Sequence, residues 1–174
     1  LKKIILPDDS YLEYTYDAAH RLTDINDAED NRIHYTLDAM GNRTNEQTYD
    51  PSNALARSST RVFNTLNRLH QEIGAAGTAS GTSTYGYDNN GNVSHILDSN
   101  RGPNYNRWLG YDGLDRLIAA GSCSFGPGCW FYYSYDALDN LTRVQSPGGV
   151  DHYYCYDTRW QLTNLKTGPC TSGA

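Results

Sequence analysis

The stretch Tyr135-Asp136-Ala137-Leu138-Asp139-Asn140-Leu141-Thr142 recurs along the chain in altered form. Each copy starts with an aromatic or apolar residue followed by Asp or Asn, and successive copies begin 21, 26, 24, 24, 24 and 21 residues apart, by subtraction of their residue numbers. The copies start at Tyr16-Asp17, Leu37-Asp38, Phe63-Asn64, Tyr87-Asp88, Tyr111-Asp112, Tyr135-Asp136 and Tyr156-Asp157. Self-similarity at a nearly fixed period is typical of repeat proteins.

A turn-and-exit triplet begins four residues after the first residue of every copy. Its middle residue alternates between Arg and Asn, with Gln in the last copy, which indicates a double unit of roughly 47 residues. The triplets are His20-Arg21-Leu22, Gly41-Asn42-Arg43, Asn67-Arg68-Leu69, Gly91-Asn92-Val93, Asp115-Arg116-Leu117, Asp139-Asn140-Leu141 and Trp160-Gln161-Leu162.

The residues around the acid predict a strand, a tight turn and a second strand. Tyr14 and Tyr16 are two apart, so they lie on one face of a strand, and most copies share this pattern; the third copy departs from it with Arg61. Asp or Asn after the aromatic starts a turn by accepting hydrogen bonds from the backbone two residues on. The first triplet position then requires positive φ, which suits Gly, Asn and Asp but fits His20 and Trp160 less well.

The outgoing strand carries one apolar residue in the triplet and, in most copies, a second one three positions later, as in Leu22 and Ile25. Residues three apart in a regular strand lie on opposite faces. Either a bulge intervenes, or both faces of the sheet are partly buried.

These units predict an all-β chain in which residues 1–174 form a single array of tandem β-hairpins, curled into part of a shell or tube. One hairpin cannot bury its aromatic face alone, so neighbouring hairpins must pair. Residues 1–10 are interpreted as the second strand of a preceding repeat, and the chain as a segment of a longer one. Tyr49 to Ser59 and Gly74 to Ser83 are predicted to be exposed loops. The predicted hairpins span about 11–30, 31–48, 59–75, 82–98, 105–121, 129–146 and 150–166.

The composition and charge of the chain indicate which partners are not expected. The 174 residues include 15 Tyr and 16 Gly and carry a net charge of −6. Without a basic stripe, nucleic acid is not an expected partner. No apolar run is long enough to span a bilayer.

No catalytic, cofactor-binding or metal site is expected, so the chain is not interpreted as an enzyme. Its Asp residues recur at one turn position, which indicates hairpin construction rather than acid–base chemistry. The sequence has no phosphate-binding Gly loop, nucleophile elbow or dinucleotide fingerprint. The five histidines show no zinc spacing; they are His20, His34, His70, His95 and His152.

Four cysteines are candidates for disulfides. Cys123 and Cys129 bracket a Gly-Pro turn, so a bridge between them would staple that loop. Folding the last hairpin at its turn puts Cys155 opposite about residue 164, so a bridge to Cys170 requires the tail to fold back. Four cysteines allow three connectivities, and four reduced, buried thiols are the alternative. Disulfides would fit an exported protein.

The pattern Tyr-x-Tyr-Asp-Ala-x-Gly-Asn-Arg/Leu-Thr resembles the YD repeat of the Rhs family over about residues 11–165. This family includes bacterial wall-associated proteins, toxin-complex C components and teneurins. The resemblance implies a hollow β-shell of spiralling hairpins, which in bacterial members encloses a toxic polypeptide and in teneurins displays adhesive surfaces. It therefore implies a secreted or cell-surface structural wall that encapsulates or carries an effector, and partners that are other repeats of the same chain or identical copies.

Two other functions remain open from the sequence. The hairpins could propagate end to end as an open filament or cell-surface fibre. Alternatively, the array could be a binding module for cell-surface glycans or a partner cell, with Trp108, Trp130 and Trp160 stacking on sugar rings.

Overall fold

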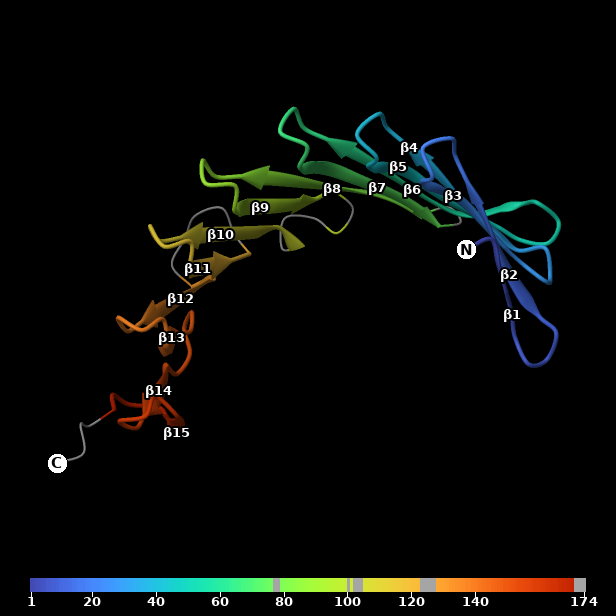
Figure 1. Cartoon of the computed structure of the whole chain (residues 1–174). Coiled ribbons are helices and arrows are strands. Elements are labelled where there is room, and N and C mark those ends of the chain that lie inside the picture. Colours follow the sequence, from blue (N-terminus) through green and yellow to red (C-terminus); the bar gives the residue numbers. More distant parts are fainter. Residues whose placement is uncertain (77–78, 100, 102–104, 123–127, 171–174) are drawn as a thin grey trace. The chain divides into compact units, whose positions relative to one another are not determined.

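The computed structural model describes residues 1–76, 79–99, 101, 105–122 and 128–170. Over these residues the chain is all-β, with fifteen strands and no α-helix, and the strands are hydrogen-bonded in sequence order in an antiparallel sheet (Figure 1). They are Lys3–Ile5 (β1), Tyr11–Tyr16 (β2), Leu22–Asp27 (β3), Arg32–Leu37 (β4), Arg43–Tyr49 (β5), Leu55–Phe63 (β6), Leu69–Ala76 (β7), Ala79–Tyr87 (β8), Val93–Asp98 (β9), Arg107–Tyr111 (β10), Leu117–Gly121 (β11), Trp130–Tyr135 (β12), Leu141–Gln145 (β13), His152–Tyr156 (β14) and Leu162–Lys166 (β15).

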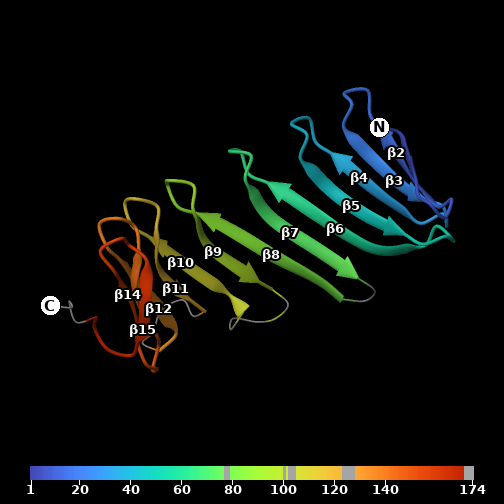
Figure 2. The same ribbon diagram turned by 60° about the horizontal axis from the view of Figure 1, so that its bottom comes forward.

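The prediction of tandem antiparallel hairpins in a curled sheet is confirmed. The chain divides into two units, Leu1–Thr84 and Tyr85–Ala174, with the boundary inside β8. Figure 2 shows that the strands of each unit lie side by side and twist from one to the next, and each unit bends as a curved sheet. The described part of the chain holds no helix with the length and hydropathy needed to cross a membrane.

The two predicted loops are wrong, because strands occupy most of both stretches. β6 begins at Leu55 and pairs with β5 through five residues, from Asn45 opposite Thr60 to Tyr49 opposite Leu55. β7 extends to Ala76 and β8 begins at Ala79. The Ser, Thr, Gly and Ala content predicts loops, but an exposed strand with paired backbone on both sides tolerates small polar side chains.

In six hairpins a β-bulge at the start of the outgoing strand explains which residues share a face. Tyr16 lies opposite Leu22 whereas Thr15 lies opposite Asp24, so Thr23 is the extra residue of the bulge. Beyond the bulge Ile25 lies opposite Tyr14, which brings Leu22 and Ile25 to the face of the paired tyrosines. The same register shift occurs in β4–β5, β6–β7, β10–β11, β12–β13 and β14–β15.

The bulged residue is Thr in four of these hairpins, and its hydroxyl supports the bulge. The Thr23 Oγ1 donates to the carbonyl of Thr15 on the partner strand at 3.3 Å. Equivalent bonds run from Thr44 to Thr36 at 3.2 Å, Thr142 to Ser134 at 3.0 Å and Thr163 to Cys155 at 2.9 Å. The final Thr of the repeat thus has a structural role that its sequence position alone did not reveal.

Little of either face is buried. Among the described hydrophobic residues, Tyr35 is the buried one, with 7% of its surface exposed. The third copy, which lacks the first aromatic residue, has a polar cluster on this face. Arg61 lies 3.2 Å from Glu72 and 3.7 Å from Glu46, and the buried Ser59 donates to Glu72 at 3.1 Å. Paired and hydrogen-bonded charges can replace an aromatic ring in this position because none is left unpartnered.

Candidate functional site: the turn ladder

Each hairpin of the repeat closes with the same five-residue turn. In the first, Asp17 N–H donates to the Arg21 carbonyl at 2.9 Å, and His20 N–H donates to the Asp17 carbonyl at 3.0 Å. The Asp17 carboxylate then accepts from the backbone N–H groups of Ala19 and Arg21, both at 2.9 Å. This is the local hydrogen bonding by which Asp stabilises a tight turn. Turns with the same backbone bonds begin at Asp38, Asn64, Asp88, Asp112, Asp136 and Asp157.

The first triplet residue has positive φ in all seven turns. Gly41 and Gly91 have φ of 92° and 99°, which Gly adopts without steric cost. His20 and Trp160 have φ of 60° and 62° in spite of their bulky side chains. The carboxylate bonds therefore set the backbone conformation, and the side chain at this position tolerates it. The remaining three positions are Asn67 (61°), Asp115 (60°) and Asp139 (65°).

The alternating Arg and Asn of the triplets connect one turn to the next. Within the first unit, the Arg21 guanidinium bonds the Asp17 carboxylate at 2.7 Å and reaches the Asp38 carbonyl of the next turn at 2.8 Å. The Asn42 amide bonds its own Asp38 at 2.8 Å and the Asn67 side chain of the following turn. Arg21 and Asn42 thus each close their own turn and bind the next one.

The second unit repeats this arrangement. The Asn92 amide bonds Asp88 at 3.2 Å and Asp115 of the next turn at 2.7 Å. The Arg116 guanidinium lies 2.7 Å from the carboxylates of Asp112 and of Asp139. We call the row of turns that begin at Asp17, Asp38 and Asn64, and in the second unit at Asp88, Asp112, Asp136 and Asp157, the turn ladder.

The tyrosines that start the repeats add a second link between hairpins. The Tyr135 hydroxyl donates to the carbonyl of Leu117, in the preceding hairpin, at 2.9 Å, and Tyr156 donates to Leu141 at 2.8 Å. The Arg116 guanidinium lies over the Tyr135 ring, 4.8 Å from its centroid, a cation–π contact. The tyrosine and the triplet residue therefore tie the same pair of hairpins together.

The turn geometry keeps its carboxyl groups ionised. The side-chain hydrogen bond from Asn42 lowers the pKa of Asp38, with further lowering by backbone N–H groups. Side-chain bonds from Arg116 and Asn140 lower the pKa of Asp112 and Asp136 in the same way. Hydrogen bonds to the charged form favour that form. Near neutral pH these aspartates are therefore ionised hydrogen-bond acceptors that stabilise the turns, and they are not suited to proton transfer.

Two further aspartate turns at the opposite edge of the first unit were missed from the sequence. Asp27 accepts from the N–H groups of Glu29 at 2.9 Å and Asn31 at 2.8 Å, and Asp50 accepts from Ser52 and Ala54, both at 2.9 Å. The sequence does carry a signal, an Asp or Asn three residues after each acid, and these residues, Asp30 and Asn53, have φ of 65° and 60°. The spacing of the ladder turns therefore recurs at both acids, of which Asp50 follows an aromatic residue, Tyr49, and Asp27 follows Asn26.

The cysteines lie near the last hairpins. Cys155 and Cys170 form a disulfide with their Cα atoms 5.6 Å apart, and Cys155 lies opposite Asn164 in the β14–β15 pair. The tail therefore folds back along β15. Cys129 is also disulfide-bonded, whereas Cys123, its predicted partner, lies outside the described residues.

The three tryptophans have different surroundings. Trp108 lies against His95, with ring centroids 5.0 Å apart, and its indole N–H is buried without a hydrogen-bond partner. Trp160 is half exposed in the last ladder turn, and Trp130 lines a cleft on β12. Among the described residues, no three His, Cys, Asp or Glu side chains are grouped to hold a metal ion.

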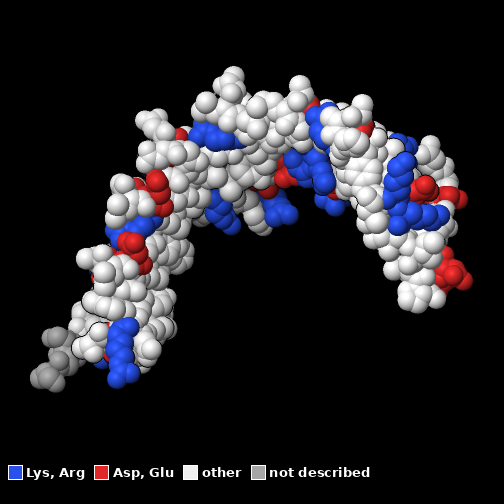
Figure 3. All heavy atoms as spheres, in the orientation of Figure 1, with Lys and Arg blue, Asp and Glu red and all other residues white. Residues whose placement is uncertain are grey.

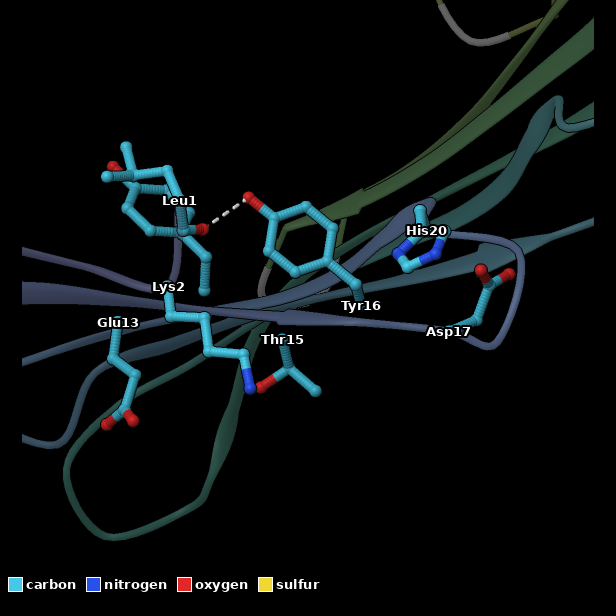
Figure 4. Close-up of a pocket in the computed structure, with 8 residues that line it drawn as sticks. Leu1, Lys2, Glu13, Thr15, Tyr16, Asp17 and His20 are labelled. Carbon is cyan, nitrogen blue, oxygen red and sulfur yellow. Dashed lines mark hydrogen bonds between the residues drawn. The ribbon is translucent and has the colours of Figure 1, made fainter.

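A pocket with a volume of about 660 Å³ lies at the first turn of the ladder. Figure 4 shows it between Leu1 and Lys2 on one side and Tyr16, Asp17 and His20 on the other. The Tyr16 hydroxyl donates to the Leu1 carbonyl at 2.8 Å. This is the bond that Tyr135 and Tyr156 make to a preceding hairpin.

Charge is distributed in small groups rather than in one patch. On the face shown in Figure 3, Lys and Arg side chains lie apart from one another, and several lie next to acidic side chains. Pairs of this kind include Arg32 with Asp24 at 2.7 Å and Arg143 with Asp151. The ion pairs thus join neighbouring strands and turns.

Removing one hydrogen bond between turns should lower the free energy of unfolding of that unit. We expect Asn92→Ala to destabilise the second unit by about 0.5–1.5 kcal/mol more than Asn140→Ala, because Asn92 bonds two turns whereas Asn140 bonds only Asp136 at 2.9 Å. Urea unfolding of both variants measures the difference. Equal losses of stability would show that the bond to Asp115 contributes nothing.

Acid should weaken the turns. Because the pKa of Asp38 is lowered below its ordinary value of 3.8, its contribution is complete above that value and is lost as the pH falls through the folded-state pKa. Asp38→Asn should keep the turn, since Asn64 makes the same backbone bonds at 3.0 Å, but should flatten the decline in stability below about pH 4. Thermal unfolding between neutral and acidic pH tests this, and an unchanged acid slope in the variant would contradict it.

Comparisons with known proteins agree with this geometry. Residues 16–60 match the family model of the RHS repeat. No curated protein sequence matches the chain. Among solved structures, the chain is similar to TcdB2-TccC3 without its hypervariable C-terminal region, at 19% identity and a TM-score of 0.51, over 91% of this chain and 10% of that one.

Two other similar structures are of the same type of assembly. The complex TcdB2-TccC3-Cdc42 aligns at 19% identity and a TM-score of 0.48 over 88% of this chain and 10% of that one. The Tc holotoxin pore of Photorhabdus luminescens aligns at 17% identity and a TM-score of 0.45 over 97% of this chain and 12% of that one. The chain thus spans about a tenth of the length of the structures it resembles. The family match covers residues 16–60, and the turns that recur through the rest of the described chain have the same backbone hydrogen bonds.

Proposed function

We propose that this chain is a structural segment of an exported bacterial Rhs-type β-shell that encloses or carries a toxin or effector polypeptide. The observation that carries the proposal is the turn ladder, in which Arg, Asn and Tyr side chains bond neighbouring hairpins to one another in place of a closed core. A sheet built in this way gains stability from every added hairpin. The disulfide between Cys155 and Cys170 suits a protein that works outside a reducing cytosol.

The register of β1 supports a single array that continues before Leu1. Leu1 accepts a hydrogen bond from Tyr16, and Leu141 accepts one from Tyr156, in both cases from a tyrosine 15 residues later. The strand pairs match as well: Lys3 with Glu13 and Ile4 with Leu12 correspond to Arg143 with Tyr153 and Val144 with His152. β1 therefore has the position of an outgoing strand, and the pocket in Figure 4 lies where the preceding turn of a longer ladder would dock.

A designed fusion tests this continuation. Residues 130–140 placed directly before Leu1 would supply an incoming strand and turn, with Leu1 in the position of Leu141. The fusion should unfold with a free energy higher by about 1–3 kcal/mol, since β1 is exposed at all three residues and would gain a paired neighbour. The matched control carries the same added residues in scrambled order. Urea unfolding that does not distinguish the two fusions would contradict the proposed continuation.

Electron imaging of the full-length natural protein that contains this sequence tests the enclosing role. We expect closed hollow particles with density inside them. Long regular fibres would instead favour an open filament and would overturn the proposal that the repeats enclose a polypeptide.

A further inference from the structure

The hairpin of β14 and β15 lacks a side-chain bond that closes earlier turns of the ladder. In the Asp136 turn, the Asn140 amide bonds the turn carboxylate at 2.9 Å. Among the described residues, the Asp157 carboxylate accepts only from backbone N–H groups, those of Arg159 at 2.8 Å and Gln161 at 3.0 Å. The Gln161 side chain thus does not supply the bond that Arg and Asn side chains make earlier in the ladder.

β15 also lacks the tyrosine link between hairpins. Leu117 and Leu141 begin β11 and β13, and their carbonyls accept from the hydroxyls of Tyr135 and Tyr156. Leu162 begins β15 in the same position, and no tyrosine in the described part of the chain donates to it. All five side chains of β15 are exposed, and Leu162 keeps 56% of its surface exposed. Pairing with β14 is therefore the main non-covalent support of β15.

The disulfide between Cys155 and Cys170 encloses this weakly supported strand. Cys155 lies in β14, and Cys170 follows the end of β15. The bridge joins residues with a sequence separation of 15, and the loop that it closes contains the Asp157 turn and all of β15. A cross-link of this kind stabilises a fold mainly by restricting the unfolded chain. While the bridge is intact, β15 can leave β14 only as a tethered loop.

The two cysteines differ in their access to solvent. Cys170 is exposed, whereas Cys155 is half-buried in the sheet. A thiolate that attacks the Cys170 sulfur forms a mixed disulfide there and displaces Cys155 as the leaving thiolate. If the attacking molecule is a dithiol, its second thiolate attacks the mixed disulfide and displaces Cys170. Two electrons thus pass to the protein, both cysteines become thiols after protonation, and the dithiol is oxidised to a cyclic disulfide.

We propose that this disulfide is a thiol-cleavable clasp, and that a dithiol reductant releases β15 while the earlier hairpins stay paired. The earlier hairpins depend on bonds that reduction leaves intact, such as the one from Tyr156 in β14 to Leu141 in β13. Parts of one structure can open locally with different free energies. Release of β15 leaves the outer N–H and C=O groups of β14 unpaired, and such an edge can accept another strand. The clasp operates independently of what the wall encloses.

Hydrogen–deuterium exchange of the full 174-residue chain, with and without dithiothreitol, tests the clasp. After reduction, the backbone N–H groups of β15 that pair with β14 should exchange at least tenfold faster, because the cross-link no longer restricts opening. The N–H groups of β13 should exchange as before. Cys155→Ser combined with Cys170→Ser should show the fast exchange of β15 without any reductant, and reduced wild-type protein keeps the test valid if this variant fails to fold.

A second disulfide requires a control, because Cys129 is also disulfide-bonded. Cys129→Ser combined with Cys123→Ser should keep the wild-type response of β15 to dithiothreitol. Alkylation of free thiols without denaturant, followed by mass spectrometry, measures which cysteines are reduced. The proposal is wrong if Cys155 and Cys170 stay oxidised under these conditions, if their reduction leaves the exchange of β15 unchanged, or if exchange rises equally in β13.

Discussion

The constraint on which the structure depends is the bond between a turn carboxylate and two backbone N–H groups. In the Asp136 turn, the carboxylate accepts from Leu138 and Asn140, each at 2.9 Å. With both donors fixed, the intervening Asp139 is held at φ of 65°, and the outgoing strand leaves in one direction. The bulge at Thr142 follows immediately and sets the register in which Leu141 lies opposite Tyr135. One short polar side chain thus determines which residues share a face over the whole hairpin.

Stability then comes from links between hairpins rather than from a closed interior. Tyr35 is the one described hydrophobic residue that is buried, so apolar burial within the sheet is small for its length. Arg116 joins three carboxylate or carbonyl groups on two turns, and Tyr135 donates across to Leu117. Exposed ion pairs alone contribute little, but here the Arg21 and Arg116 guanidinium groups also donate to a backbone carbonyl of the next turn. Such nearest-neighbour coupling is how repeat proteins acquire cooperativity.

The sequence predicts the hairpins because their chemistry is local. Asp136 and Tyr135 stand next to each other, and the hydrogen bonds of the turn reach no further than four residues, so the fold class could be predicted from spacing. The errors arose where the signal was weaker or longer in range. Asp50 makes the same turn as Asp17, but no aromatic pair marks it, so the composition of the stretch predicts a loop. By their side chains alone His20 and Trp160 fit the positive φ poorly, whereas the carboxylate before them fixes the backbone.

Contacts between turns could not be predicted from spacing, although the alternation of Arg and Asn contained the information. Arg21 extends to the next turn's carbonyl, and Asn42 reaches only the nearer side chain of Asn67. Long Arg and shorter Asn side chains alternate along the ladder. The Asp38 turn, for example, is bonded by Arg21 of the preceding turn and bonds the following turn through Asn42. Recognising this needs the strand order, which places consecutive turns at one edge of the sheet.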